Sequence, residues 1–340
     1  VPMTDEPDVH PEDEADGVGA ASSRRKALIS SVVGAVLGGA AMFLVVRTLV
    51  SEWEDAKAAI TDAQVGWLVA AVVLGSAGMA SIGVVWGRVL HRFGVRVGTV
   101  RVLAWYFVGE LGKYLPGGVW PVVGRGELAR RGGVPRTRAY ASVALSLGML
   151  YLAAMFVATA FVPFAVTGGG FSPWMLCLLA LPVGVVALHH SVIEWLVSLV
   201  SRVTGRTIGI EVPRWRESLT LVAMYIPTWI LVGGATWAVA RAITPDASMP
   251  RVVFAAVLSW VVGFLAVPVP AGAGVREAVL LAASGLDGGV AAATAIIARV
   301  IFIAVDAVGG LLGAPVAGRR RAGATVGPLP GAEEPVVGPG

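Results

Sequence analysis

Long apolar runs recur along the whole chain, and they constrain its fold more than any other feature. Each run is close to the ~20 residues that a helix needs to cross a bilayer, where the backbone must satisfy its own hydrogen bonds. Hydrophobic residues make up 56% of the chain and charged residues 14%, whereas soluble domains carry about a quarter charged residues. The sequence therefore predicts an all-α polytopic membrane protein. The predicted full spans are 28–50, 64–87, 139–166, 174–197, 218–240 and 289–316.

Two further apolar segments, 102–124 and 252–285, are interrupted near their middle by proline and glycine. Proline removes a backbone donor and glycine favours turns, so each segment should bend there rather than form one straight helix. We expect each to form a re-entrant hairpin. The residues predicted at the turns are Pro116, Gly117, Gly118, Pro268, Pro270, Gly272 and Gly274.

The arginines and lysines support this interpretation. They cluster before the first span, on both sides of 102–124, between the fourth and fifth spans and after the last span. The positive-inside rule assigns these loops and both termini to the cytoplasm. Segment 102–124 then leaves from and returns to the same side, and by parity 252–285 enters from the other side. The alternative is that both segments cross completely, which gives eight or more spans.

The two interrupted segments also resemble each other. "LPGGVWPVVGRGE" and "VPAGAGVRE" share proline, glycine, and then arginine close to glutamate. Two copies that enter from opposite sides are typical of an inverted repeat, which places a binding site near the interface of the repeats.

The two ends of the chain differ in composition from the middle. Residues 1–23 contain seven acidic residues and no lysine or arginine, and we expect a disordered acidic cytoplasmic tail. Residues 24–321 form the predicted membrane domain, and the Gly/Pro-rich residues 322–340 form a second disordered cytoplasmic tail. The basic residues are explained by loop placement, so no nucleic-acid partner is predicted. The single cysteine, Cys177, cannot form an intrachain disulfide, and no metal or other cofactor is predicted.

Ionisable residues inside apolar segments are costly and therefore suggest function. Each has a purely structural alternative. Glu110 and Lys113 are three residues apart and could neutralise each other on one helix face, and Arg299 lies seven residues before Asp306 and could pair with it. Arg125 and Glu127, at the rim, could be solvated loop charges. Glu277 could be favoured by the helix N-terminus, and Arg276 could extend toward the interface. The candidates for substrate binding are Lys113, Arg125, Arg276 and Arg299. The candidates for charge balance or coupling are Glu110, Glu127, Glu277 and Asp306.

A helix that starts near Val275 would point its N-terminus into the protein at membrane depth. Its free N–H groups and its dipole attract anions. With Arg276 and Arg299 nearby, an anionic lipid headgroup is the expected ligand. Trp105, Trp120 and Trp260 are interpreted as interface or packing residues.

Two motifs resemble a known family. "GELGKYLPGGVWPVVGRGELARRGGVPR" and "VPVPAGAGVREAVLLAASGLDGGVAAATAIIARVIF" are similar to the membrane domain of the lysylphosphatidylglycerol synthase family, whose members include stand-alone bacterial proteins without the soluble synthase domain. The resemblance covers roughly residues 28 to 316. One departure is the helix after the first motif, "YASVALSLGMLYLAAM", which lacks the charged cluster of the family. The motif positions are Pro116, Gly117, Gly126, Glu127, Pro270, Gly272, Gly274, Glu277 and Arg299.

The resemblance implies a flippase-like domain that binds or moves an anionic phospholipid or glycolipid in the bacterial cytoplasmic membrane. We expect no enzymatic activity. One alternative is a membrane-embedded phosphatase of polyprenyl phosphate, but neither interrupted motif, "LPGGVWPVVGRGE" or "VPAGAGVRE", contains serine, threonine or histidine as nucleophile or proton donor. The other alternative is a non-transporting scaffold for a cell-envelope synthase.

Overall fold

Helices dominate the described part of the chain, as the apolar runs predict. The computed structural model describes residues 63–115, 119–165, 215–266, 270–318 and 324–327, and the single positions 43, 47, 50 and 186. The following predictions lie outside these residues, apart from the single positions: spans 28–50 and 174–197, tail 1–23, most of tail 322–340, and turn residues Pro116, Gly117, Gly118 and Pro268.

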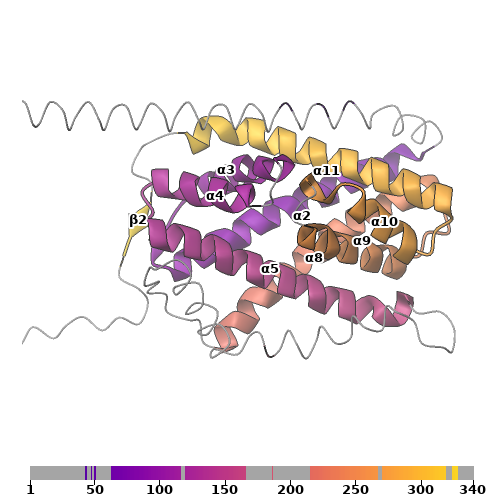
Figure 1. Ribbon diagram of the computed structural model, residues 1–340, viewed down its shortest axis with the longest axis horizontal. Coiled ribbons are helices and arrows are strands. Elements are labelled where there is room, and N and C mark those ends of the chain that lie inside the picture. The colour runs from indigo at the N-terminus through magenta and orange to yellow at the C-terminus, as the bar shows by residue number, and fades with distance from the viewer. Residues whose placement is uncertain are drawn as a thin grey trace, which may run out of the picture.

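Four long helices form the frame of the protein (Figure 1). Each has 28 to 30 residues and is apolar enough to cross a membrane. At 1.5 Å per residue they are about 42–45 Å long, which exceeds the ~30 Å hydrocarbon core. They agree with four of the predicted spans to within a few residues. The helices are α2 (Val65–Arg92), α5 (Arg136–Ala165), α8 (Trp215–Ile243) and α11 (Gly288–Ala317).

The first interrupted segment folds as two short helices joined by a turn. Helix α3 (Thr99–Glu110) continues into the 3-10 turn η1 (Leu111–Tyr114), and α4 (Trp120–Arg131) returns beside α3. Glycines allow the two arms to pack closely: a Cβ added at Gly109 would lie 2.6 Å from the Arg125 Cγ atom. We call residues 99–131 the first hairpin.

The second interrupted segment folds in the same way. Helix α9 (Met249–Leu265) and helix α10 (Val275–Ala283) pack against each other, with the 3-10 turn η3 (Pro270–Gly272) between them. The turn uses the left-handed backbone region, with φ of 51° at Ala271, 69° at Gly272 and 79° at Gly274. Glycine adopts this region without strain, which explains two of the predicted turn residues. We call residues 249–283 the second hairpin.

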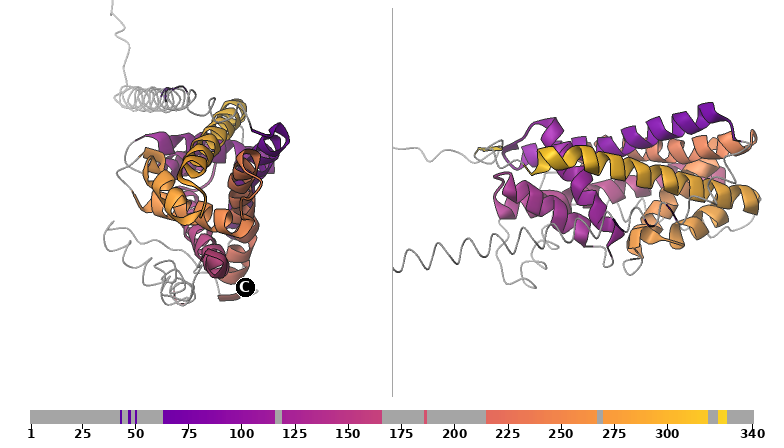
Figure 2. Two further views of the ribbon diagram at one scale, coloured as in Figure 1. Left: turned by 90° about the vertical axis from the view of Figure 1, so that its right-hand side faces the viewer. Right: turned by 90° about the horizontal axis from the view of Figure 1, so that it is seen from above.

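The two hairpins occupy opposite ends of the frame, and their tips meet in the middle (Figures 1 and 2). Turn η1 packs against η3. Leu111, Tyr114 and Leu115 form a small apolar cluster with Ile303, and Ala271 packs against it. Ile303 lies near the centre of α11, so the tips meet at mid-height of a long helix. Whether either hairpin is re-entrant in a membrane remains a prediction.

A two-residue antiparallel pair ties the C-terminal part of the chain to the first hairpin. Strand β2 (Thr325–Val326) pairs with β1 (Val95–Arg96), which directly precedes α3. The Arg138 guanidinium donates to the carbonyls of Phe93 at 3.1 Å and Gly327 at 2.9 Å. Residues 324–327 lie inside segment 322–340, for which the composition predicts disorder, and that disorder stays a prediction.

Candidate functional site

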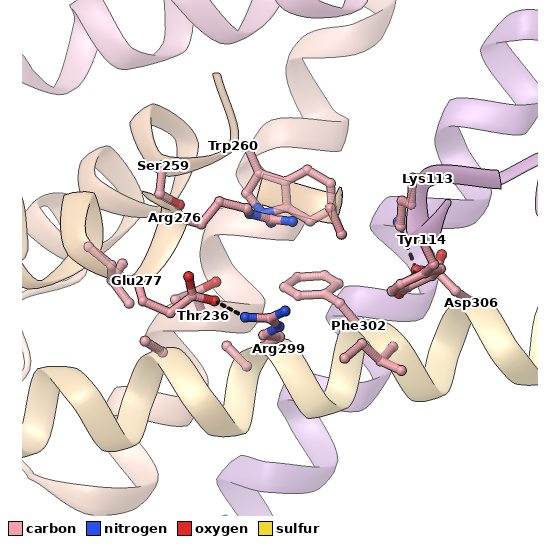
Figure 3. Close-up of a pocket in the computed structure, with 15 residues that line it drawn as sticks. Lys113, Tyr114, Thr236, Ser259, Trp260, Arg276, Glu277, Arg299, Phe302 and Asp306 are labelled. Atoms are coloured by element: carbon pink, nitrogen blue, oxygen red, sulfur yellow. Dashed lines mark hydrogen bonds and ion pairs between the residues drawn. The ribbon is translucent and has the colours of Figure 1, made fainter. Parts of the chain in front are cut away.

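A cavity of about 50 Å³ lies where the two hairpin tips face α11 (Figure 3). One water needs roughly 10–15 Å³, so this space suits a few waters or a small polar group. Helix α11 supplies one face of the wall, because residues spaced three or four apart point in the same direction. The wall residues from α11 are Ala295, Ala298, Arg299, Phe302, Ile303 and Asp306.

Arg299 and Glu277 form an ion pair on the wall of the cavity. The Arg299 Nη1 atom donates to Glu277 Oε1 at 2.8 Å, and the two side chains are 19% and 25% exposed. Glu277 is the third residue of α10, so the short helix brings it to α11. The sequence interpretation paired Arg299 with Asp306 as its structural alternative. The observed carboxylate is Glu277, since α10 packs beside Arg299 and Asp306 lies two turns further along α11.

Arg276 lies flat on Trp260. The guanidinium carbon is 3.5 Å from the centre of the Trp260 ring, a cation–π distance. Within the part of the chain that the structure describes, no carboxylate lies within 4.0 Å of the Arg276 guanidinium. The side chain passes Gly263, where a Cβ would lie 2.4 Å from the Arg276 Cγ atom. Arg276 is therefore a cation of the cavity wall that is stacked but not neutralised by direct contact.

Lys113 joins the first hairpin to α11. Its ammonium nitrogen is 2.7 Å from Asp306 Oδ2 and 3.4 Å from Glu110 Oε1. The Tyr114 hydroxyl donates to the same Asp306 oxygen at 2.8 Å. Asp306 is fully buried, and its other oxygen, Oδ1, has no hydrogen-bond partner. The expected pairing of Glu110 with Lys113 is present, but Asp306 is the nearer carboxylate.

Arg125 is buried inside the protein and is not a solvated loop residue. Its side chain is 3% exposed, pairs with Glu110 and stacks on the Tyr106 ring at 4.6 Å. Arg125 does not line the cavity. It connects to the cavity through Glu110, which also contacts Lys113. The close approach of α4 to Gly109 explains this burial, which a rim position in the sequence does not suggest.

Glu127 lies apart from the cavity, on the outward face of α4. It accepts hydrogen bonds from Arg130 at 2.8 Å and from Arg131 at 2.9 Å, and both arginines are exposed. The hydrogen bond from Arg130 is the largest cause that lowers the pKa of Glu127 to about 2. The structure thus does not bring Glu127 together with the other predicted site residues.

Seven ionisable side chains make up what we call the charged cluster. Four are cationic and three are carboxylates, so one positive charge is in excess when all are ionised. Burying unbalanced charge in a membrane protein is costly unless a partner neutralises it. The cluster therefore suits a monoanion. Its members are Glu110, Lys113, Arg125, Arg276, Glu277, Arg299 and Asp306.

Several wall residues were not among the sequence candidates. Trp260 was interpreted as an interface or packing residue. It lies on the cavity wall and stacks on Arg276, because α9 turns this face toward α10. Trp105 is fully buried, in line with packing. Tyr114 carries a usable signal, a hydroxyl beside the charged Lys113 at a helix break. Thr236, Ser259 and Phe302 have no comparable signal, since they lie inside ordinary apolar helices.

Within the described ranges, no group of three or more histidine, cysteine, aspartate or glutamate side chains is placed to hold a metal ion. Cys177 lies outside those ranges.

Comparison with known proteins assigns the chain to a family. No curated protein matches the chain. The sequence model described as "Lysylphosphatidylglycerol synthase TM region" matches residues 28–313, which include both hairpins and nearly all of α11. The match agrees with the resemblance of the two motifs and with the long apolar helices. The chain is thus a multi-pass membrane protein that belongs to the lysylphosphatidylglycerol synthase TM region family.

Proposed function

We propose that this protein binds the anionic headgroup of a membrane lipid in the cavity and carries it across the bilayer. The observation that supports this most is the excess positive charge of the charged cluster, with Arg276 facing the cavity without a carboxylate in contact. A phosphodiester carries one negative charge and would neutralise that excess. Arginine suits this role because its planar fork matches phosphate oxygens and stays ionised.

The proposed membrane placement follows from the loops and the long helices. Basic loops flank the first hairpin, so it enters from the cytoplasm and the second hairpin enters from outside. The tips then meet near the bilayer midplane, where inverted-repeat transporters hold their substrates. In this placement both termini face the cytoplasm of a bacterium, and the two hairpins are the corresponding parts of an inverted repeat.

The proposed mechanism is alternating access to one site. The headgroup phosphate would contact Arg276 and Arg299 and approach the N-terminus of α10, while the acyl chains remain in the bilayer. Ala271, Gly272 and Gly274 form the turn that would adjust between the two states, since glycine positions absorb backbone rotation readily. Movement of one hairpin tip past the other would expose the cavity to each side in turn.

A binding measurement tests the site. Purified full-length protein in detergent is titrated with dihexanoyl phosphatidylglycerol, and with dihexanoyl phosphatidylcholine as the net-neutral comparison. We expect tighter binding of the glycerol lipid, and a loss of roughly tenfold or more in Arg276→Gln, because a charge-assisted contact contributes about 1.5–3 kcal/mol. Arg88→Gln is the matched control, since Arg88 is exposed on α2. Equal affinity for the two lipids in the unmodified protein would contradict the proposed headgroup site.

A transport measurement separates the proposal from its alternatives. The protein is reconstituted in phosphatidylcholine vesicles with labelled phosphatidylglycerol, and the label that becomes accessible to a membrane-impermeant quencher is followed. Binding without transport would favour a scaffold. Release of phosphate from polyprenyl phosphate would favour the phosphatase. A phosphatase would need a nucleophile at the cavity. The hydroxyls of Ser259 and Thr236 lie on the cavity wall, but each already donates to a carbonyl of its own helix, at 2.7 Å and 3.3 Å.

A further inference from the structure

Asp306 is the most deeply buried carboxylate of the charged cluster. It is fully buried, its Oδ2 atom receives both Lys113 and Tyr114, and its Oδ1 atom has no hydrogen-bond partner. Burying an ionised oxygen without a hydrogen-bond donor is strongly unfavourable in free energy, whereas burying a neutral carboxyl is much less so. The two oxygens of this carboxyl group are therefore unequal: Oδ2 accepts from two donors, and Oδ1 has no hydrogen-bond partner.

Lys113 lies between two carboxylates and can form an ion pair with either. Its ammonium group is 2.7 Å from Asp306 and 3.4 Å from Glu110. If Asp306 becomes neutral, Lys113 keeps an ionised partner in Glu110 and does not become a stranded charge. Lys113 also lines the cavity, so once Asp306 is neutral, the positive charge of Lys113 is available where a headgroup would bind.

We propose that Asp306 is a proton-binding site coupled through Lys113 to the headgroup site, so that an anionic headgroup and one proton bind together. This inference rests on the proposed function. In the proton step, a hydronium ion in the cavity gives its proton to Asp306 Oδ1, an O–H bond forms there, and a water molecule remains. Lys113 keeps all its protons and exchanges its contact with Asp306 for contacts with Glu110 and the headgroup phosphate.

Several elements bring charged or titratable groups close to Asp306. Turn η1 contributes Lys113 and Tyr114, and α3 contributes Glu110 and Tyr106. Helix α10 contributes Arg276 and Glu277, and α11 itself contributes Arg299. Helices α8 and α9 contribute only the non-titrating Thr236, Ser259 and Trp260 to the shared cavity. Glu277 is held by Arg299, and Glu110 is held by both Arg125 and Lys113. Asp306 can thus become neutral while the cation beside it, Lys113, keeps an ionised partner in Glu110.

The charge of the cluster predicts the sign of the coupling. Protonation of Asp306 raises the excess from one positive charge to two, which strengthens the attraction for an anion. Linkage is reciprocal, so a bound headgroup must favour the proton by the same factor. We therefore expect proton uptake on lipid binding and tighter binding at lower pH.

Calorimetry of the full-length protein measures both quantities without any variant. Dihexanoyl phosphatidylglycerol is titrated in two buffers of different ionisation enthalpy, and the difference in heat gives the number of protons taken up. We expect uptake that approaches one proton per lipid, and an affinity that rises at least about fivefold from about pH 8 to about pH 5, in the range typical of coupled sites. In Asp306→Asn, which mimics the neutral carboxyl, proton uptake should vanish and binding should be tight at both pH values.

Asp246→Asn is the control, because Asp246 is an exposed carboxylate in the loop that follows α8. It should take up the same number of protons as the unmodified protein. Lipid binding with no proton uptake in the unmodified protein would overturn the coupling and leave the headgroup site intact. Unchanged proton uptake in a folded Asp306→Asn variant would assign the proton to another residue and equally refute the role of Asp306. No lipid binding at any pH would instead refute the proposed function.

Discussion

Replacement of Arg299 by alanine tests which carboxylate this arginine balances. The change strands Glu277, whose Oε1 atom accepts from Arg299 at 2.8 Å and whose Oε2 atom has no hydrogen-bond partner. Removing one partner of a fully buried ion pair costs ~3–5 kcal/mol. Here the side chains are 19% and 25% exposed at a polar cavity, so water compensates part of the loss. We expect Arg299→Ala to lower the free energy of unfolding by about 2 kcal/mol.

A double-mutant cycle identifies the partner. Glu277→Gln added to Arg299→Ala should recover about 1–2 kcal/mol, because it removes the stranded charge. Asp306→Asn added to Arg299→Ala should be additive within about 0.5 kcal/mol, since seven residues along a helix place the two positions about 10 Å apart. Unfolding by titration with sodium dodecyl sulfate in mixed micelles, followed by tryptophan fluorescence, measures each variant.

Lipid binding must be measured on the same preparations. Arg299→Ala should weaken the binding of dihexanoyl phosphatidylglycerol, and the double variant with Glu277→Gln should remain weak although its stability recovers. Arg88→Ala, on the exposed face of α2, is the control for loss of an arginine. Rescue of stability by Asp306→Asn and not by Glu277→Gln would refute the ion-pair assignment. Normal lipid affinity in Arg299→Ala would remove this arginine from the site.

Three further predictions follow from the packing, the loops and the rim. Gly109→Ala should destabilise the protein by about 1–3 kcal/mol, because the new Cβ would lie 2.6 Å from a neighbouring side-chain carbon. Gly148→Ala should stabilise the protein by about 0.5–1 kcal/mol, because nothing lies within 4 Å of its new Cβ. Unfolding measurements compare the two variants. In a chain without its native cysteine, a cysteine at the exposed Arg131 should be labelled only from the cytoplasmic side and one at the exposed Asp246 only from outside; labelling from one shared side would contradict hairpins that enter from opposite sides. The pKa of Glu127 is lowered to about 2, so its ion pairs stabilise the protein above the ordinary glutamate pKa of ~4.3, and this stabilisation is lost as the pH falls toward 2. Glu127→Gln should therefore flatten the dependence of stability on pH over that range and leave lipid binding unchanged.

The long apolar runs of the sequence were sufficient to find the four long helices. Runs such as 289–316 are so apolar that a membrane-spanning helix is the expected structure, because it satisfies the backbone hydrogen bonds within the segment. Helix α11 has nearly the predicted ends. The two interrupted segments were found as well, because proline and glycine at a helix break act locally. That the tips of the two hairpins meet could not be derived from local signals, since turns η1 and η3 are about 160 residues apart.

The partners within the site were harder to predict, because they depend on contacts between distant segments. Asp306 and Tyr114 are separated by 192 positions, so no local spacing reveals their hydrogen bond. The local alternative for Arg299 was Asp306, yet α10 brings Glu277 closer. Arg125 looked like a rim residue, and only the approach of α4 to Gly109 explains why it is buried. Charges in apolar segments could thus be recognised as candidates, but their pairing could not.

The short strand pair between β1 and β2 has a consequence for the order in which the protein is made. Val95 pairs with Val326, so the partner of β1 is synthesised about 230 positions later. Ribosomes add about 5–20 residues per second, which corresponds to a delay on the order of 10–50 s. Until the end of this interval the start of the first hairpin lacks β2 and the bonds that join Gly327 to Arg138 and to Gly94. Closure of this end therefore comes only after every helix of the frame has been made.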